Sequence, residues 1–345
     1  MARSHASPDE RRPGGLSVAA ACLRSLTYTK ASVIMAHLIQ PHVEGKRMTG
    51  LLALVCVLLL CAGPASLDLY GQKITLDEKA AHGVSMTYHN GKYFMAWTGL
   101  SNRIYVMRSD EGVDWRAKIA LDERSDHAPD ITSDGEYLYM IWGGENSNNI
   151  IIMRSRDGVD WENKVLIDER TNVRPAIAAS EEGLLLIAWK GETSNKIHIM
   201  RSRDGVDWGA EITLDEETLN GMSLADFNGR FYLAWTGVSN NDVYVMRSRE
   251  GVDWTTKIKL DERSRKAPSL ATYGDRLYMG WVGESSGDIY VHSTEDGVDW
   301  ENKVRTGEQT GKSIKLCGGH KLAVGFQGKD SDAVYCMMSR DGVDF

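Results

Sequence analysis

The sequence predicts an all-β fold, a six-bladed β-propeller whose blades are four-stranded antiparallel sheets. A nonapeptide, MRSRDGVDW, occupies residues 153–161 and recurs unchanged at 200–208. Near-copies lie at 107–115, 246–254, 292–300 and 337–345, and the glycines of successive copies are 45 to 47 residues apart. Each unit between copies holds four short runs rich in Ile, Val, Tyr, Trp and Leu, separated by Gly, Asp, Asn and Ser. Such runs are typical of antiparallel strands, and a fixed period near 46 residues is typical of propeller blades.

The four expected strands of one unit are clearest in the segment after Trp254. An extended stretch at 255–263 precedes two apolar runs within 267–283, which a Gly-Asp turn separates, and a third run at 287–293. The third runs are apolar at successive positions, as in 149–155, so both faces of each sheet should be covered. A repeated sheet that is covered on both faces by its neighbours is a propeller blade.

The two ends of the repeat predict how the ring closes. The chain stops at the sixth copy of the nonapeptide, whereas residues 69–78 match the strand that follows a copy but have no copy before them. We therefore expect residues 72–76 to pair as the outermost strand beside residues 333–338. Six blades would then close into a ring and leave no sheet edge exposed at the junction.

The nonapeptide resembles the Asp-box, or BNR repeat, of the sialidase superfamily. Ser155, Asp157, Gly158 and Trp161 match Ser-x-Asp-x-Gly-x-x-Trp, although one residue fewer separates Asp from Gly. The resemblance implies a turn between the third and fourth strands of a blade, on the rim away from the active site, with its Trp packed between sheets. The residue chemistry agrees, because Asp and Ser bond backbone N–H groups in turns and Gly accepts a positive φ. A metal or ligand site formed by DGVD is the alternative interpretation.

Catalysis of the kind that the resemblance implies needs residues that the sequence does not offer clearly. A sialidase uses three arginines that grip a carboxylate, a tyrosine activated by a glutamate, and an aspartate as general acid. The Arg-Ile-Pro motif of the first arginine is absent, and Arg174, within VRPA, lacks the isoleucine. Arg124, Arg170 and Arg263 recur at equivalent positions of separate blades, where we expect loop ion pairs. The histidines show no metal-ligand spacing, so we expect neither a metal nor a cofactor.

The loops between the second and third strands are the first candidate ligand site. Each loop has an aromatic residue, then Gly, then amides and hydroxyls, a composition that suits sugar binding because rings stack on pyranoses and polar groups bond hydroxyls. The alternative is that the tryptophans are core wedges and the polar residues only close hairpins. Phe326 and Lys329 break the pattern, so the sixth blade should be the poorest site. The candidate residues are Trp97, Trp142, Trp189, Trp235, Trp281, Asn102, Asn148, Asn195 and Asn240.

The mouth of the central channel is the second candidate site. First strands line the channel of a propeller, and aligned positions at or just before the first strands differ between blades. A mostly cationic mouth on an acidic protein would favour an anionic ligand, whereas free variation of exposed positions would give the same differences. The residues at these positions are His82, His127, Asp130, Arg174, Lys266 and Lys312.

Composition and the N-terminal segment suggest export. Residues 51–61 form an eleven-residue apolar run that follows Lys46 and Arg47 and precedes small residues, the pattern of a secretory signal, and the run is too short to span a bilayer. We expect a leader over 1–65 and the propeller over 66–345. The propeller holds 33 Lys and Arg against 45 Asp and Glu, which disfavours nucleic acid as a partner. Cys317 and Cys336 could form one disulfide or be buried as free thiols.

These observations together predict a secreted, monomeric, non-catalytic propeller that binds a glycan or another small polar ligand through its repeated loops. Two other functions stay open. One is a sialidase-like glycoside hydrolase, which a convergent pair of carboxylates at the channel mouth would favour. The other is a protein-interaction or structural module, which a flat face without pockets would favour.

Overall fold

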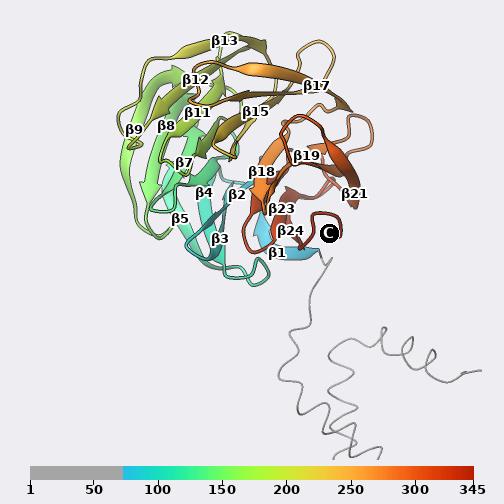
Figure 1. The fold of residues 1–345 in the computed structure, drawn as a ribbon. Coiled ribbons are helices and arrows are strands. Elements are labelled where there is room, and N and C mark those ends of the chain that lie inside the picture. The colour runs from blue at the N-terminus through green and yellow to red at the C-terminus, as the bar shows by residue number, and fades with distance from the viewer. Residues whose placement is uncertain (1–72) are drawn as a thin grey trace, which may run out of the picture. The chain divides into compact units, whose positions relative to one another are not determined.

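The computed structural model describes residues 73–345, which form 24 strands arranged as six four-stranded antiparallel sheets. The predicted six-bladed all-β propeller is therefore correct. Successive blades follow one another around the ring in chain order (Figure 1). The first strand of each blade contacts the first strand of the next, and the first strand of the sixth blade contacts that of the first. The predicted leader over 1–65 lies outside the described residues.

The blades are numbered one to six from the first complete sheet. Blade one comprises β2 (Val84–His89), β3 (Lys92–Thr98), β4 (Arg103–Ser109) and β5 (Arg116–Arg124); blade two comprises β6 (Asp130–Ser133), β7 (Leu138–Gly143), β8 (Asn149–Ser155) and β9 (Trp161–Arg170); blade three comprises β10 (Ala176–Ala179), β11 (Leu185–Lys190), β12 (Lys196–Ser202) and β13 (Ile212–Glu217). Blade four comprises β14 (Ser223–Phe227), β15 (Arg230–Thr236), β16 (Asp242–Ser248) and β17 (Thr255–Arg263); blade five comprises β18 (Ser269–Tyr273), β19 (Arg276–Val282), β20 (Asp288–Thr294) and β21 (Glu301–Gln309); blade six comprises β22 (Lys315–Gly318), β23 (Leu322–Gln327), β24 (Ala333–Ser339) and β1 (Ile74–Lys79).

Blade six takes its outermost strand from the other end of the described chain. β1 pairs antiparallel with β24, with Ile74 opposite Cys336, Thr75 opposite Tyr335 and Lys79 opposite Ala333. The observed strand starts two residues later than the predicted 72–76 and runs further, and Gln72 lies outside the described residues. Pairing satisfies the N–H and C=O groups that β24 would otherwise expose as a sheet edge.

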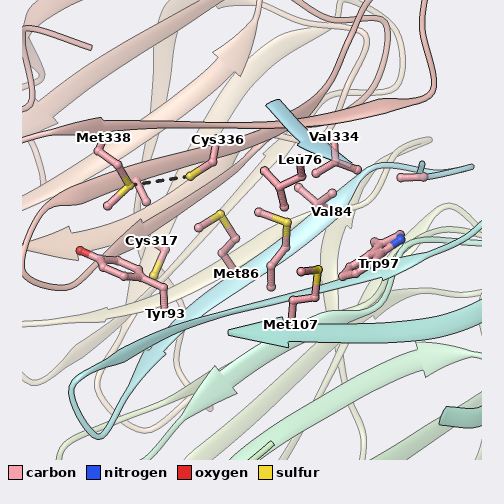
Figure 2. Close-up of a cluster of buried hydrophobic side chains, with 13 residues drawn as sticks. Leu76, Val84, Met86, Tyr93, Trp97, Met107, Cys317, Val334, Cys336 and Met338 are labelled. Atoms are coloured by element: carbon pink, nitrogen blue, oxygen red, sulfur yellow. Dashed lines mark hydrogen bonds between the residues drawn. The ribbon is translucent and has the colours of Figure 1, made fainter. Parts of the chain in front are cut away.

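A buried apolar cluster joins β1 to the two blades beside it. Leu76 of β1 is 6% exposed and packs with Met86 and Trp97 of blade one and with Val334 and Cys336 of blade six (Figure 2). Because the cluster draws on three separate segments of the chain, we infer that β1 contributes to the packing of blade one as well as of blade six.

Both cysteines of the propeller are buried free thiols, so the disulfide alternative is not realised. Burial raises the pKa of the Cys317 thiol to about 12, and it raises the pKa of Cys336 as well. The Cys336 sulfur lies 3.7 Å from the sulfur of Met338 (Figure 2). Thiols that stay protonated and apolar at neutral pH behave as small hydrophobic residues.

The repeated nonapeptide forms the turn between the third and fourth strands, as expected. In blade two the turn joins Ser155 at the end of β8 to Trp161 at the start of β9. The Ser155 hydroxyl accepts from the Gly158 N–H at 2.9 Å, and one carboxylate oxygen of Asp157 accepts from the next two N–H groups at 2.8 and 3.1 Å. These bonds lower the pKa of Asp157, chiefly through the Val159 N–H.

The glycine of the turn is required both by its φ and by its surroundings. Gly158 has a φ of 74°, and a Cβ placed there would lie 2.3 Å from a ring carbon of Phe94 in blade one. The Trp161 indole donates to the Gly158 carbonyl at 3.3 Å and packs against the core between blades one and two. The turn thus locks each blade onto the blade before it, which is a structural role.

Candidate ligand-binding sites

The five loop tryptophans lie in the core. Each is at most 1% exposed, so no ring face is open to a sugar. This placement corresponds to the core-wedge alternative, and it arises because each tryptophan is the penultimate residue of the second strand of its blade, where its side chain is buried. The tryptophans that occupy this position are Trp97, Trp142, Trp189, Trp235 and Trp281.

The loop asparagines tie neighbouring blades together. The Asn102 side chain donates to Glu145 of the next blade at 3.1 Å, and Asn148 donates in the same way to Glu192 at 2.7 Å. The carbonyls of Asn102, Asn148, Asn195 and Asn241 each accept a backbone N–H from the following loop, which identifies equivalent positions. The equivalent residue in blade four is therefore Asn241 and not the predicted Asn240. The Asn240 side chain instead donates to the Tyr244 hydroxyl at 2.9 Å.

The arginines that end the fourth strands form the expected loop ion pairs. Arg124 approaches Glu145 at 3.9 Å, Arg170 approaches Glu192 at 3.8 Å and Arg263 approaches Glu284 at 3.3 Å. In each pair the glutamate belongs to the next blade. These guanidinium groups are distributed around the ring and do not converge on one ligand.

A groove between two blades offers the accessible aromatic and polar groups that the buried tryptophans cannot supply. In the gap between blades six and one, the half-buried Tyr105 stacks on Trp97 with ring centres 5.6 Å apart and an interplanar angle of 22°. The Lys118 ammonium lies 4.5 Å from the centre of the Tyr105 ring and 2.5 Å from the carboxylate of Glu78 on β1. Leu100 also lines this groove and is 57% exposed. An aromatic ring, a cation and a carboxylate from the neighbouring blade thus meet at one surface.

The same set, here called a Tyr–Lys–Glu groove, recurs between four pairs of described blades. The Tyr–Trp or Tyr–Phe stacks have ring centres 5.4 to 5.6 Å apart. The groove between blades five and six has a cavity of about 410 Å³, and the one between six and one has a cavity of about 600 Å³. The four sets are Tyr105, Lys118 and Glu78; Tyr244, Lys257 and Glu216; Tyr290, Lys303 and Glu262; and Tyr335, Lys73 and Glu308.

Two gaps depart from this pattern. Between blades one and two, Lys164 pairs with Glu123, but Ile151 replaces the tyrosine. Between blades two and three, Glu211 replaces the lysine and accepts from His198 at 2.6 Å. Burial and the neighbouring Glu211 raise the pKa of Glu169 there.

The channel mouth is a separate cavity of about 270 Å³ on the side of the loops that precede the first strands. Five of the six residues predicted for this mouth line it together: His82, His127, Arg174, Lys266 and Lys312. Asp130 is the exception, because it lies on the buried first strand of blade two and is 1% exposed. There it accepts from Lys315 at 2.5 Å and from Ser85 at 2.6 Å.

Carboxylates gather in the channel at its other end. A cavity of about 610 Å³ there is lined by Asp134, Glu181 and Asp226, among other residues, whereas the described lining of the mouth holds no Asp or Glu. Burial and the nearby Glu181 and Glu182 raise the pKa of Asp226 to about 6. A carboxyl group with a pKa raised toward neutrality is the type of group that acts as a general acid, so this end is where the glycoside hydrolase alternative has a candidate.

The six four-stranded sheets define the chain as a six-bladed β-propeller, and comparison with solved structures finds other proteins of similar fold. No protein-family model matches the sequence, and no curated protein matches it. Among solved structures, a Hadza microbial sialidase is 13% identical with a TM-score of 0.57, over 76% of this chain and 66% of that chain. The fucose-specific lectin from Aleuria aurantia is 11% identical with a TM-score of 0.53, over 79% and 99%. The SapL1 lectin in complex with alpha methyl fucoside is 15% identical with a TM-score of 0.54, over 73% and 90%. Identities this low show a shared fold alone.

Within residues 73–345, no helix has the length and apolar character needed to cross a bilayer.

Proposed function

We propose that this protein is a secreted carbohydrate-binding propeller whose sites are the Tyr–Lys–Glu grooves. The observation that carries the proposal is the recurrence of one aromatic–cation–carboxylate set in four gaps between blades. Residues that serve only folding need not place a charged pair beside a half-buried ring at the surface. The fucose-binding lectins among the structural neighbours support the proposal, as does the secretory pattern of residues 51–61.

The groove offers the groups that a pyranose needs. The lysine donates hydrogen bonds to sugar hydroxyls, and the glutamate accepts hydrogen bonds from them. Charged partners make such bonds stronger than neutral ones. The tyrosine ring and, in one groove, Leu100 supply the apolar surface against which sugar C–H groups pack. Lys118 is 41% exposed and Glu78 is 14% exposed, so the lysine is the more accessible of the two to a ligand.

Binding at a single groove should be weak and binding by the whole ring strong. Shallow sites of this kind bind on the order of millimolar to micromolar. Four copies on one rigid ring could raise the apparent affinity for a multivalent glycan by about 10²–10⁴.

Absence of catalysis is part of the proposal, and it is supported by the sequence, which lacks the Arg-Ile-Pro motif of sialidases. A glycoside hydrolase needs two carboxyl groups on either side of the scissile bond, and the described residues that line the mouth supply none. The rival site is the opposite channel end. Hydrolysis of fluorogenic glycosides that is lost in Asp226→Asn would establish that rival.

Substitution of a groove tyrosine should remove one site and leave the fold intact. A glycan array identifies the sugar, and titration calorimetry with a monovalent form then counts sites in Tyr244→Ala and in the wild type. We expect stoichiometry to fall by one, because the ring and its cation contact are lost together.

Tyr137→Ala is the matched control, since Tyr137 also contacts cationic side chains but lies near the nonapeptide turns. Equal loss of binding in Tyr137→Ala and Tyr244→Ala would contradict the assignment of the grooves.

A further inference from the structure

The centre of the channel carries more positive than negative charge. Arg174, Lys315 and Asp130 are 8%, 5% and 1% exposed. Burial alone would raise the pKa of Asp130, but Lys315 and Arg174 hold it below its ordinary value, so the carboxylate is ionised. Asp130 also accepts from Ser85 and from the backbone N–H of Ile177. One carboxylate thus faces two buried cations, and uncompensated buried charge is unfavourable.

Arg174 in particular has donors to spare. Its Nε has no hydrogen-bond partner among the described residues, and its Nη1 makes a long contact, 3.5 Å, to the Val84 carbonyl. Lys315 takes the short contact to Asp130, at 2.5 Å. A guanidinium offers five donors in a planar fork that matches the oxygens of a carboxylate or phosphate. Arg174 therefore lines the mouth cavity as a buried cation with an unused Nε donor.

The rim above Arg174 adds further positive charge. Lys266 and Lys312 are half-buried and line the same cavity, and neither forms an ion pair with another residue of 73–345. Asp126, the acid nearest the two rim histidines, is held by bonds from the Asn102 side chain and the Asn146 N–H. Elsewhere on the described surface, lysines such as Lys118 and Lys257 are paired with glutamates.

We propose that the channel mouth binds a small oxyanion, a phosphate or carboxylate group, with Arg174 at its base and Lys266 and Lys312 at its rim. The cavity of about 270 Å³ accommodates an anion of this size. This site is separate from the Tyr–Lys–Glu grooves, so the proposal does not depend on carbohydrate binding there.

The pKa values of the two histidines at the rim can report the binding of an anion. His82 and His127 lie with ring centres 6.1 Å apart. Burial lowers the pKa of both histidines. The nearby Lys312 lowers the pKa of His82 further, and His82 does the same to the pKa of His127, whereas Asp126 raises both values. A bound anion favours the protonated rings and should raise both pKa values. By linkage, binding should strengthen as the pH falls through these pKa values.

The test uses the whole chain and inorganic phosphate, with glucose as the neutral control. Histidine resonances are followed by NMR from pH 5 to 8 with and without phosphate, and affinity is measured by calorimetry. We expect one site per chain and raised pKa values at His82 and His127. The Lys266→Gln, Lys312→Gln double variant should lose at least about 10-fold in affinity, the equivalent of about 1.4 kcal/mol. Lys92→Gln, which makes the same kind of charge change beside Asp110 near a nonapeptide turn, should lose nothing.

Three further arms separate the possible outcomes. Arg174→Lys keeps the buried charge but not the fork, and should weaken binding while the protein stays folded. Glucuronate that competes with phosphate would identify a carboxylate as an accepted group, and failure to compete would restrict the site to phosphate. Tyr244→Ala should leave phosphate binding unchanged, which distinguishes this site from the grooves. Unchanged histidine pKa values in phosphate, or an equal loss in Lys92→Gln, would overturn the proposal.

Discussion

Deletion of residues 73–79 is expected to destabilise the entire ring. The deletion removes β1, exposes the edge of β24 and takes Leu76 out of the cluster that joins blades six and one. Since each blade is stabilised by its neighbours, the loss should be on the order of 5 kcal/mol, comparable to the total stability of many domains. Urea unfolding followed by tryptophan fluorescence measures it.

A point variant separates the contribution of the β1 backbone pairing to stability from that of the Leu76 side chain. Leu76→Ala keeps the β1 backbone pairing and should cost about 2–4 kcal/mol. A truncated protein that melts at the temperature of the parent would show that β1 is not needed to close the ring.

Trp161→Ala should cost about 3–5 kcal/mol, because it opens a cavity between blades one and two and removes the indole bond to Gly158. Asp157→Ala, in the same turn, should cost only about 1–2 kcal/mol, for the loss of two turn bonds. Thermal unfolding of the two variants gives the comparison.

Val159→Ala is the control for the turn, since Val159 is 40% exposed and its side chain packs little. Sugar binding by the folded fraction should be unchanged in all three variants. A marked loss of affinity without a loss of stability would identify the turn as a ligand site.

The fold follows from the sequence because repetition exposes the strand pattern. The six turn glycines mark units of nearly equal length, and the short apolar runs within a unit such as 255–293 indicate its strands. The position of β1 was also predictable, since residues 69–78 match a fourth strand that lacks its blade. Its bounds were less so, because strand ends depend on pairing that the pattern alone does not determine.

The Tyr–Lys–Glu grooves could not be predicted from the sequence in the same way. Trp97 lies near the end of a strand, beside a polar loop, and the sequence alone does not decide between burial and exposure there. Lys118 and Glu78 lie on different blades, so their contact depends on how two sheets pack. A signal was present, because a lysine three residues after the turn aromatic and a glutamate five residues later recur in most units. The poor sixth site predicted from Phe326 and Lys329 stays a prediction; Phe326 itself is buried and stacks on Tyr335 as the tryptophans do on their partners.

The channel mouth was predictable because first strands line a propeller channel and aligned positions share a depth. His82, His127, Arg174, Lys266 and Lys312 meet there as expected. Asp130 was misplaced by this reasoning, since its position on the strand puts it below the mouth. Its partner Lys315 comes from blade six, and a pair formed across the channel leaves no local signal in the sequence.

Groove stoichiometry tests the central claim most directly. Between blades one and two the Lys164–Glu123 pair is already present and only the tyrosine is missing, so Ile151→Tyr should complete a fifth groove. Calorimetry with the sugar that the glycan array selects should count four sites in the wild type and five in Ile151→Tyr. A single site that is abolished by Arg174→Gln and unaffected by both Tyr244→Ala and Ile151→Tyr would contradict the account and move carbohydrate binding to the channel mouth.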